Sequence, residues 1–496
     1  CRCFVEACWV MIVVTVGVVC MRIYRQYLSS ILFLAAVLLT AATSMAAEEG
    51  DSAPSEEVAS TDASAAEIES LPEDYSCLFC HADPEQFTDD QRHLLVTKEQ
   101  LEGDIHWKKG LRCHDCHGGS PDPAQFTDHR NDDTFKGVGE PADIPAFCGS
   151  CHSDIQFMRR YDPSARTDQE SEYWTSAHGR KLKASVEDEN MEQDTTVATC
   201  IDCHGGRHAI LAVDDQHSTV YPTHVAETCA QCHANAQVMA GRTYYDRVSK
   251  MDRPLPTDQY EFWQESVHGK ALLEKGDLSA PTCNDCHGNH GAMPPDVDSV
   301  ANACGACHGK VAELFGATQM KHKFEQEGLP GCATCHGNHR IHSPTDELLG
   351  MGSGAICKAC HEANNIRHEA TLAGADVAKT LRDGLEQLKQ QIADAEATVE
   401  EAELLGMEVR GPRYELRQAR DALTNARTLI HTFSVAPVEE VLAEGRKVAE
   451  EVQQLADDAL AEHTYRRVWL ATSLLPILFV VVLLVLYIRS MPLPPR

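Results

Sequence analysis

The sequence predicts a mainly α-helical protein with much irregular loop, followed by a helical bundle and one transmembrane helix. Three observations predict this fold. The motif Cys-x-x-Cys-His occurs nine times between residues 77 and 361. Apolar residues then recur every three or four positions from residue 377 to residue 455, as in amphipathic helices. The segment 468–488 contains no charged residue and is long enough to cross a bilayer.

The first 46 residues have the pattern of a secretory signal peptide. The segment from Met21 begins with basic residues, continues with an apolar run and ends in small residues, so we expect cleavage after Ala46. Residues 1–20 hold a second apolar run, which we interpret as the product of a gene start assigned too far upstream. An N-terminal membrane anchor is the alternative. Residues 47–74 contain ten acidic residues and no Lys or Arg, which is typical of a disordered linker.

The nine motifs contain 18 of the 22 cysteines. One helical turn places both thiols of a motif on one edge of a haem, where they form thioethers, and the next residue presents its imidazole to the iron. Zinc ribbons, thioredoxin-like thiol pairs and disulfide frameworks are alternatives, but none of them needs a histidine after every second cysteine.

We therefore predict nine covalently attached haem c groups with iron. The attachment residues are Cys77, Cys80, Cys113, Cys116, Cys148, Cys151, Cys200, Cys203, Cys229, Cys232, Cys283, Cys286, Cys304, Cys307, Cys332, Cys335, Cys357 and Cys360. The proximal iron ligands are His81, His117, His152, His204, His233, His287, His308, His336 and His361. Each motif has only about 32 residues of chain, too few for an ordinary apolar core, so the haems themselves should form the core of a domain spanning 75–365.

After the first motif, the other eight form four pairs, and a lone histidine precedes each pair. In three pairs a glycine-rich continuation of the first motif ends in a trailing histidine. This histidine is too close in sequence to bind the far side of its own haem easily, so we expect it to reach a neighbouring iron. The predicted second axial ligands are the lone His106, His178, His268 and His322 and the trailing His208, His290 and His339. Further candidates are His93, His224 and His431.

Residues 366–465 are predicted to form three amphipathic helices, with breaks at Gly411-Pro412 and at Pro437. We interpret them as a structural stalk; a dimerisation surface is the alternative role. The third helix leads into the predicted span, 468–488, which Arg467 and Arg489 flank. The expected export of the N-terminal part then places the tail, 489–496, in the cytoplasm. The net charge of −32 makes nucleic acid an unexpected partner.

The phrases SVHGKALLEKG, APTCNDCHGNH and ACGACH, within residues 75–361, resemble those of bacterial periplasmic multihaem cytochromes c with doubled haem motifs. The resemblance implies electron transfer between a membrane quinol oxidoreductase, or a cytochrome b-type partner, and other periplasmic cytochromes or reductases. A partial likeness to octahaem hydroxylamine oxidoreductases and multihaem nitrite reductases is limited, because all nine motifs end in histidine and no Cys-x-x-Cys-Lys unit occurs.

We therefore expect an electron carrier in the periplasm, anchored in the cytoplasmic membrane by its C-terminal helix, rather than a catalyst. The alternative is an oxidoreductase of nitrite, hydroxylamine or a sulfur compound, with one five-coordinate haem. The pair that begins at Cys113 and Cys148 lacks a trailing Gly-x-His phrase, so an open iron is expected there if one exists.

Overall fold

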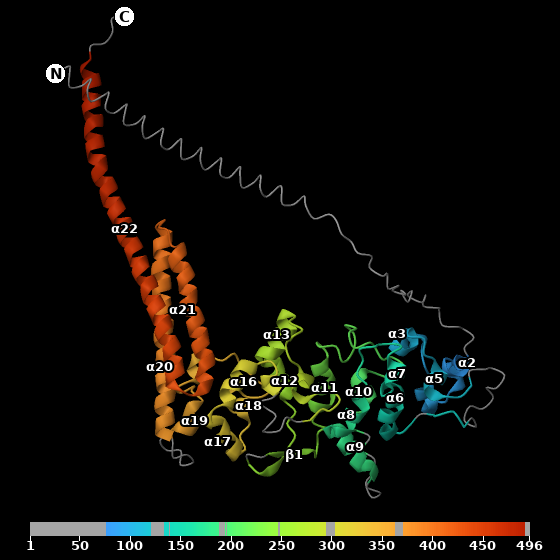
Figure 1. The fold of residues 1–496 in the computed structure, drawn as a ribbon. Coiled ribbons are helices and arrows are strands. Elements are labelled where there is room, and N and C mark those ends of the chain that lie inside the picture. Colours follow the sequence, from blue (N-terminus) through green and yellow to red (C-terminus); the bar gives the residue numbers. More distant parts are fainter. Residues whose placement is uncertain are drawn as a thin grey trace, which may run out of the picture. The chain divides into compact units, whose positions relative to one another are not determined.

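The computed structural model describes residues 76–120, 133–137, 139–187, 194, 196–246, 249–293, 303–362 and 371–491. The expected signal peptide, acidic linker and most of the C-terminal tail lie outside these ranges. The described chain consists mainly of helices and loops, which confirms the predicted fold class (Figure 1).

Most of the described motifs form short helices that end at or next to the motif histidine. These are α2 (Leu78–His81), α5 (Cys113–His117), α6 (Ile144–His152), α10 (Cys200–His204), α11 (Val225–His233), α14 (Cys283–His287), α18 (Gly331–His336) and α19 (Cys357–His361). The seventh motif, 304–308, directly precedes α16 (Gly309–Gly316).

Aspartates within the motifs help these helices to begin. The carboxylate of Asp285 accepts a hydrogen bond from the backbone N–H of Thr282 at 2.7 Å, and Asp202 accepts one from Thr199 at the same distance. A carboxylate in the first helical turn also faces the positive end of the helix dipole. The glycine after the motif histidine then ends the helix: Gly288 has φ +85°, a conformation that a side chain would strain.

Other short elements connect the motifs. They are η1 (Pro84–Gln86), η2 (Asp89–Leu94), α3 (Lys98–Gly103), α4 (Ile105–Lys108), η5 (Pro141–Asp143), α7 (Ile155–Met158), α8 (Gln169–Thr175), α9 (Ala177–Glu187), β1 (Thr243–Asp246), β2 (Met251–Pro254), α12 (Gln259–Glu265), α13 (Val267–Lys275), α17 (Gln319–Glu327) and η6 (Asp346–Leu348). Strands β1 and β2 form an antiparallel hairpin in which Thr243 pairs with Pro254.

The two helix pairs α8–α9 and α12–α13 repeat one local structure around a Ser-x-His-Gly sequence. The buried Ser176 hydroxyl donates to the Tyr173 carbonyl at 2.6 Å and accepts from the Gly179 N–H at 2.9 Å. A Cβ atom on Gly179 would lie 2.1 Å from the Tyr173 carbonyl oxygen, so the backbones approach too closely for any side chain. Ser266 and Gly269 repeat this arrangement. His178 and His268 therefore occupy equivalent positions in two closely packed helix corners of the same kind.

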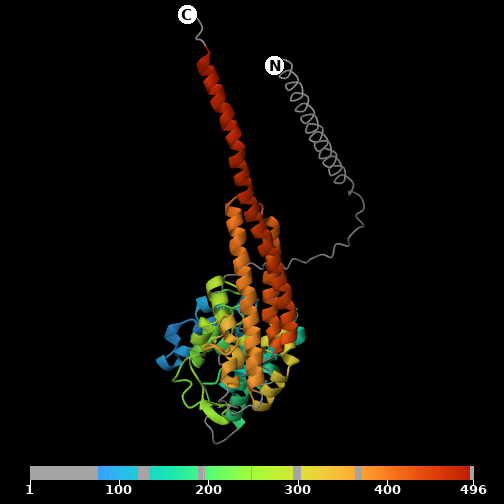
Figure 2. The ribbon, with the colours of Figure 1, turned by 90° about the vertical axis from the view of Figure 1, so that its left-hand side faces the viewer.

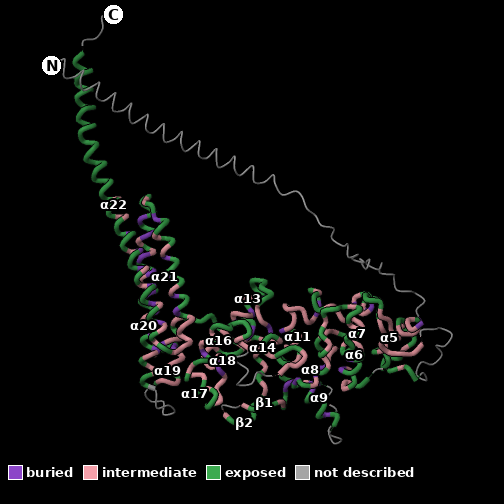
Figure 3. The backbone as a smooth tube through the Cα atoms, viewed as in Figure 1, coloured by how far each residue is buried: buried purple, intermediate pink, exposed green. Residues whose placement is uncertain are grey.

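The motif region contains little apolar core of its own. Its buried apolar side chains form small clusters, one around Tyr173, Leu182 and Val197 and another around Ala226, Trp263 and Leu272. Most of the region is only partly buried (Figure 3). This agrees with the expectation that side chains alone do not fill its interior.

The C-terminal helices, by contrast, share a continuous apolar core. Helices α20 (Thr371–Leu404), α21 (Arg410–Leu429) and α22 (Val435–Ser490) pack side by side, and the turn η7 (Ile430–Thr432) joins the last two (Figures 1 and 2). Most of their predicted apolar positions form or pack against this core, but Phe433 lies outside it, Leu455 is exposed, and Ala456 is buried. Pro437 lies in the first turn of α22, where its missing N–H costs no hydrogen bond.

Helix α22 continues from the bundle into the predicted span without a break. Its apolar second half is long enough to cross a membrane and is exposed along its length (Figure 3). Pro476 lies inside this half, a position that membrane-spanning helices tolerate. This helix is therefore a candidate membrane anchor.

Candidate haem-binding region

One continuous cavity runs through the motif region. Its volume is about 5160 Å³, and all nine motif histidines line it. Divided over nine motifs, this is about 570 Å³ each, within the range of about 300–1,000 Å³ that pockets for small molecules and cofactors occupy. The space and its lining therefore fit one bulky prosthetic group at each motif.

The spacing of histidine rings gives a second test of this fit. A bond between a metal ion and an imidazole nitrogen is about 2 Å long, and the ring centre lies roughly 1 Å behind that nitrogen. Two imidazoles on opposite sides of one iron should therefore have ring centroids about 6 Å apart.

Seven motif histidines have a second histidine ring at this spacing. The centroid distances are 6.0 Å for His117–His208, 6.0 Å for His152–His106, 6.1 Å for His204–His290, 6.1 Å for His233–His178, 6.0 Å for His287–His339, 6.4 Å for His308–His268 and 6.2 Å for His336–His431. Six of the seven predicted second ligands thus lie opposite a motif histidine.

Burial lowers the pKa of ten of these imidazoles and so favours their neutral form, the form that binds iron. It lowers the pKa of His204 to about 4. Burial also lowers the pKa values of His152, His178, His208, His233, His268, His287, His290, His336 and His339.

Hydrogen bonds at Nδ1 orient several of these rings so that Nε2 is left for a metal. Nδ1 of His287 donates to the Met293 carbonyl at 3.2 Å, and Nδ1 of His117 donates to the Gly137 carbonyl at 3.2 Å. At His106 the partner is the buried carboxylate of Asp104, 3.1 Å away. Carbonyl and carboxylate partners of this kind fix the tautomer and direction of a metal-bound histidine.

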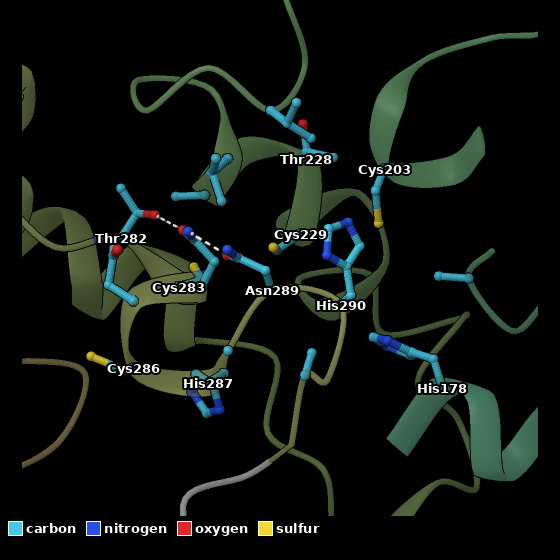
Figure 4. A pocket seen from close by; sticks show the side chains of 18 of the residues that line it. His178, Cys203, Thr228, Cys229, Thr282, Cys283, Cys286, His287, Asn289 and His290 are labelled. Carbon is cyan, nitrogen blue, oxygen red and sulfur yellow. Dashed lines mark hydrogen bonds between the residues drawn. The ribbon is translucent and has the colours of Figure 1, made fainter. Parts of the chain in front are cut away.

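Figure 4 shows how segments distant in the sequence converge on one such pair. His290 follows α14, yet its ring lies between the cysteines of other motifs, near Cys203 and Cys229, rather than beside its own His287. It stacks almost parallel to His204, with an interplanar angle of 8°. The trailing histidine thus faces a neighbouring motif, as its sequence position predicts.

The cysteines bring consecutive motifs into contact. The first cysteines of motifs 1 and 2, Cys77 and Cys113, have their side chains in contact. The same contact joins Cys148 to Cys200, Cys229 to Cys283, and Cys304 to Cys332. Between these pairs, the second cysteines of consecutive motifs lie near one another: Cys116 and Cys151, Cys203 and Cys232, Cys286 and Cys307, and Cys335 and Cys360. The motifs therefore form one series in sequence order.

The first and ninth motifs have different surroundings. His81 lies 5.4 Å from the ring of Phe87, and its Nδ1 donates to the Leu94 carbonyl at 2.9 Å. The ring of His361 packs against the backbone of α20 at Gly374. Its Nδ1 is buried and has no hydrogen-bond partner among the described residues.

Three candidate ligands do not face a motif histidine in the described chain. His322 lies on α17 with 65% of its side chain exposed, and Gln326 contacts its ring. His93 is exposed, and His224 packs beside Tyr221. His431, by contrast, faces a motif histidine, His336. The sequence offers it only as a further candidate, because nothing in the helical pattern around it indicates which haem it would face.

The comparisons with known proteins bear on one part of this region. Residues 277–362 match the cytochrome c3 family, whose members carry covalently bound haem c. No curated protein and no solved structure matches the chain. The matched segment contains four of the nine motifs, and the match supports a multihaem cytochrome c.

Proposed function

We propose that this protein is a membrane-tethered periplasmic cytochrome that conducts electrons along nine haems arranged in sequence order. The observation that carries the proposal is the alternating series of cysteine contacts. Because each thiol would be bonded to the edge of its own haem, the closeness of cysteines in consecutive motifs would bring consecutive haem edges together. Transfer between such haems is outer-sphere, and its rate falls steeply with distance.

Paired axial histidines support a carrier rather than a catalyst. An iron with two imidazole ligands is low-spin and exchanges electrons without binding a substrate. The pair at Cys113 and Cys148, where the sequence suggested an open iron, has a second imidazole opposite each motif histidine, His208 for His117 and His106 for His152. A membrane quinol oxidoreductase or a cytochrome b-type protein is the proposed donor. Other periplasmic cytochromes or reductases are the proposed acceptors.

A second function, conversion of a small nitrogen or sulfur compound at an open iron, is favoured by the surroundings of the ninth motif. Within the described residues no second imidazole faces His361, whose ring packs on Gly374. Low-temperature EPR of the oxidised protein, with haem quantified in the same sample, separates the two functions. Low-spin signals alone support a carrier. A stoichiometric high-spin signal that responds to nitrite, hydroxylamine or cyanide would identify a catalytic iron.

The linear order is testable by removing one haem at a time. The protein is attached to an electrode through a tag placed before Ser76, so that electrons enter at the first motif. Replacing Cys229 and Cys232 with alanine removes the fifth haem, and we expect only the four haems before it to remain in rapid exchange with the electrode. The matched control replaces Cys357 and Cys360 and should leave eight haems connected. Equal charge passed by both variants would contradict a single series.

A further inference from the structure

Six of the seven histidine pairs follow a rule that relates one repeat to the next. A lone histidine faces the second motif of its own pair, as His178 faces His233. A trailing histidine instead faces the first motif of the preceding pair: His208 faces His117, His290 faces His204, and His339 faces His287. The two middle repeats therefore each contribute one imidazole to their own second motif and one to the repeat before them.

A backbone hydrogen bond accompanies this exchange at each junction. The N–H of the residue before a lone histidine donates to the carbonyl two residues after a trailing histidine of the next repeat. The bonds are Ile105 to Ile210 at 2.7 Å, Ala177 to Ala292 at 2.9 Å, and Val267 to Ile341 at 2.8 Å. Successive repeats are thus joined at three junctions by the same pair of contacts.

The last repeat has no following repeat to complete it. The N–H of Lys321, which precedes the lone His322, donates to the Thr318 hydroxyl of its own helix at 3.1 Å instead of to a later segment. His322 itself is exposed. By the rule, the first motif of this pair, with His336, lacks a trailing histidine from a following repeat.

His431 occupies the position that this missing histidine would take. Its ring centroid lies 6.2 Å from that of His336, nearly the 6.0–6.1 Å of the three trailing pairs, and the interplanar angle of 25° lies within their range of 8° to 50°. Nδ1 of His431 donates to the Thr428 carbonyl at 3.0 Å. This bond leaves Nε2 as the nitrogen that can bind a metal.

Three contacts hold the turn that carries His431 against the motif region. The guanidinium of Arg427 donates two hydrogen bonds to the carboxylate of Asp346, at 2.9 and 2.7 Å. The ring of Phe433 packs edge-on against Phe315 at 6.3 Å. Phe433 has φ +50°, so the chain turns sharply there before α22 begins. The position of His431 is therefore set by packing, an ion pair and backbone geometry together.

We propose that His431 is the sixth ligand of the iron at the eighth motif, and that the helical bundle thereby takes the place of a following repeat. The inference rests on the proposed loading of haem at each motif. In this arrangement the bundle is part of the redox domain rather than a separate stalk. It closes the far side of the eighth haem to small ligands, and a metal–ligand bond fastens the anchor helix to the haem series.

The test compares two single substitutions, His431→Ala and His322→Ala, in the full-length protein. Haem content is measured by intact mass, and spin state by low-temperature EPR. We expect both variants to keep the haem content of the wild type. His431→Ala should convert one haem in nine to high spin, and added imidazole should restore the low-spin signal. His322→Ala, the matched control, should have the spectrum of the wild type.

A third variant, His431→Met, covers the case in which the alanine variant does not fold. Methionine can bind haem iron, and a His/Met iron has a higher potential than a bis-histidine iron, so one haem should titrate at a raised potential. Unchanged spectra and potentials in both His431 variants would overturn the proposal. A high-spin haem in His322→Ala would assign the ligand to His322 instead. Fewer than nine haems in the wild type would contradict the proposed function itself. The His431 variants test only the sixth ligand, because they are expected to keep the haem content of the wild type.

Discussion

Replacing Leu388 with alanine tests whether the three C-terminal helices share one core. Leu388 lies at the centre of the bundle with 0% of its surface exposed. A Cβ atom built on Gly445 of α22 would lie 2.8 Å from Leu388 Cδ2 and 2.9 Å from Ala422 Cβ of α21. The leucine side chain therefore fills the point where all three helices meet.

The expected cost follows from this burial. Truncating a buried leucine to alanine costs about 2–5 kcal/mol, because apolar contacts are lost and a cavity remains. The backbone at Gly445 cannot move far inward, since its own helix is held along its length by the rest of the core. Each 1.4 kcal/mol changes an equilibrium about tenfold, so local opening of the bundle should become at least about 25-fold more frequent.

Hydrogen exchange measured by mass spectrometry on the intact protein reports this opening peptide by peptide. We expect faster exchange in peptides from all three helices of Leu388→Ala. The matched control is Leu404→Ala, the same change on the same helix at a side chain that is 89% exposed, where the effect should be within about 0.5 kcal/mol. Equal exchange in the two variants, or a change confined to α20, would refute a shared core.

Three other perturbations have defined outcomes. Removing the ion pair by Arg427→Ala should weaken docking of the bundle by about 1 kcal/mol or less, because Arg427 is 43% exposed. The hydrogen bonds from Arg427 lower the pKa of Asp346. The carboxylate's contribution is therefore present above the ordinary carboxyl pKa and is lost as pH falls through the lowered one. Hydrogen exchange near η7 should differ between wild type and variant at pH 7, and the difference should begin to shrink below about pH 4. Gly179→Ala should displace the helix corner that carries His178 and produce one high-spin haem by EPR, whereas Gly103→Ala, where a Cβ meets nothing within 4 Å, should not. A stop codon at Tyr465 removes the apolar half of α22, and the truncated protein should be extracted without detergent while keeping its haem content; continued need for detergent would argue against this helix as the anchor.

The sequence predicted the C-terminal helices well because their apolar positions have a helical period. The three helices begin and end near the predicted breaks. Even so, Leu455 fell outside the core and Ala456 inside it, since the burial of a small side chain close to a neighbouring helix depends on packing rather than on hydrophobicity.

The attachment motifs could be read from the sequence because their residues are adjacent, but the pairing of distant histidines could not. His290 and His204 are far apart along the chain, and only the fold brings their rings together. His322 and His431 show the limit most clearly. The repeat pattern favoured His322, whereas the structure leaves it exposed and places His431 opposite His336. Nothing local to His431 distinguishes it from a surface histidine on a helix turn.

The unbroken course of α22 sets a distance between the haems and the lipid. From Val435, close to His431, to the start of the apolar segment at residue 468, the helix contains 33 residues. At about 1.5 Å per residue this is a rise of roughly 50 Å. With the apolar half in a bilayer, an upright helix would hold the eighth haem well above the headgroups. If the proposed function holds, a quinol in the hydrocarbon layer could not transfer an electron over that gap, and a membrane donor would need a redox centre of its own at the same height. On this proposal the helix would act as a spacer that admits only donors whose redox centre reaches this height.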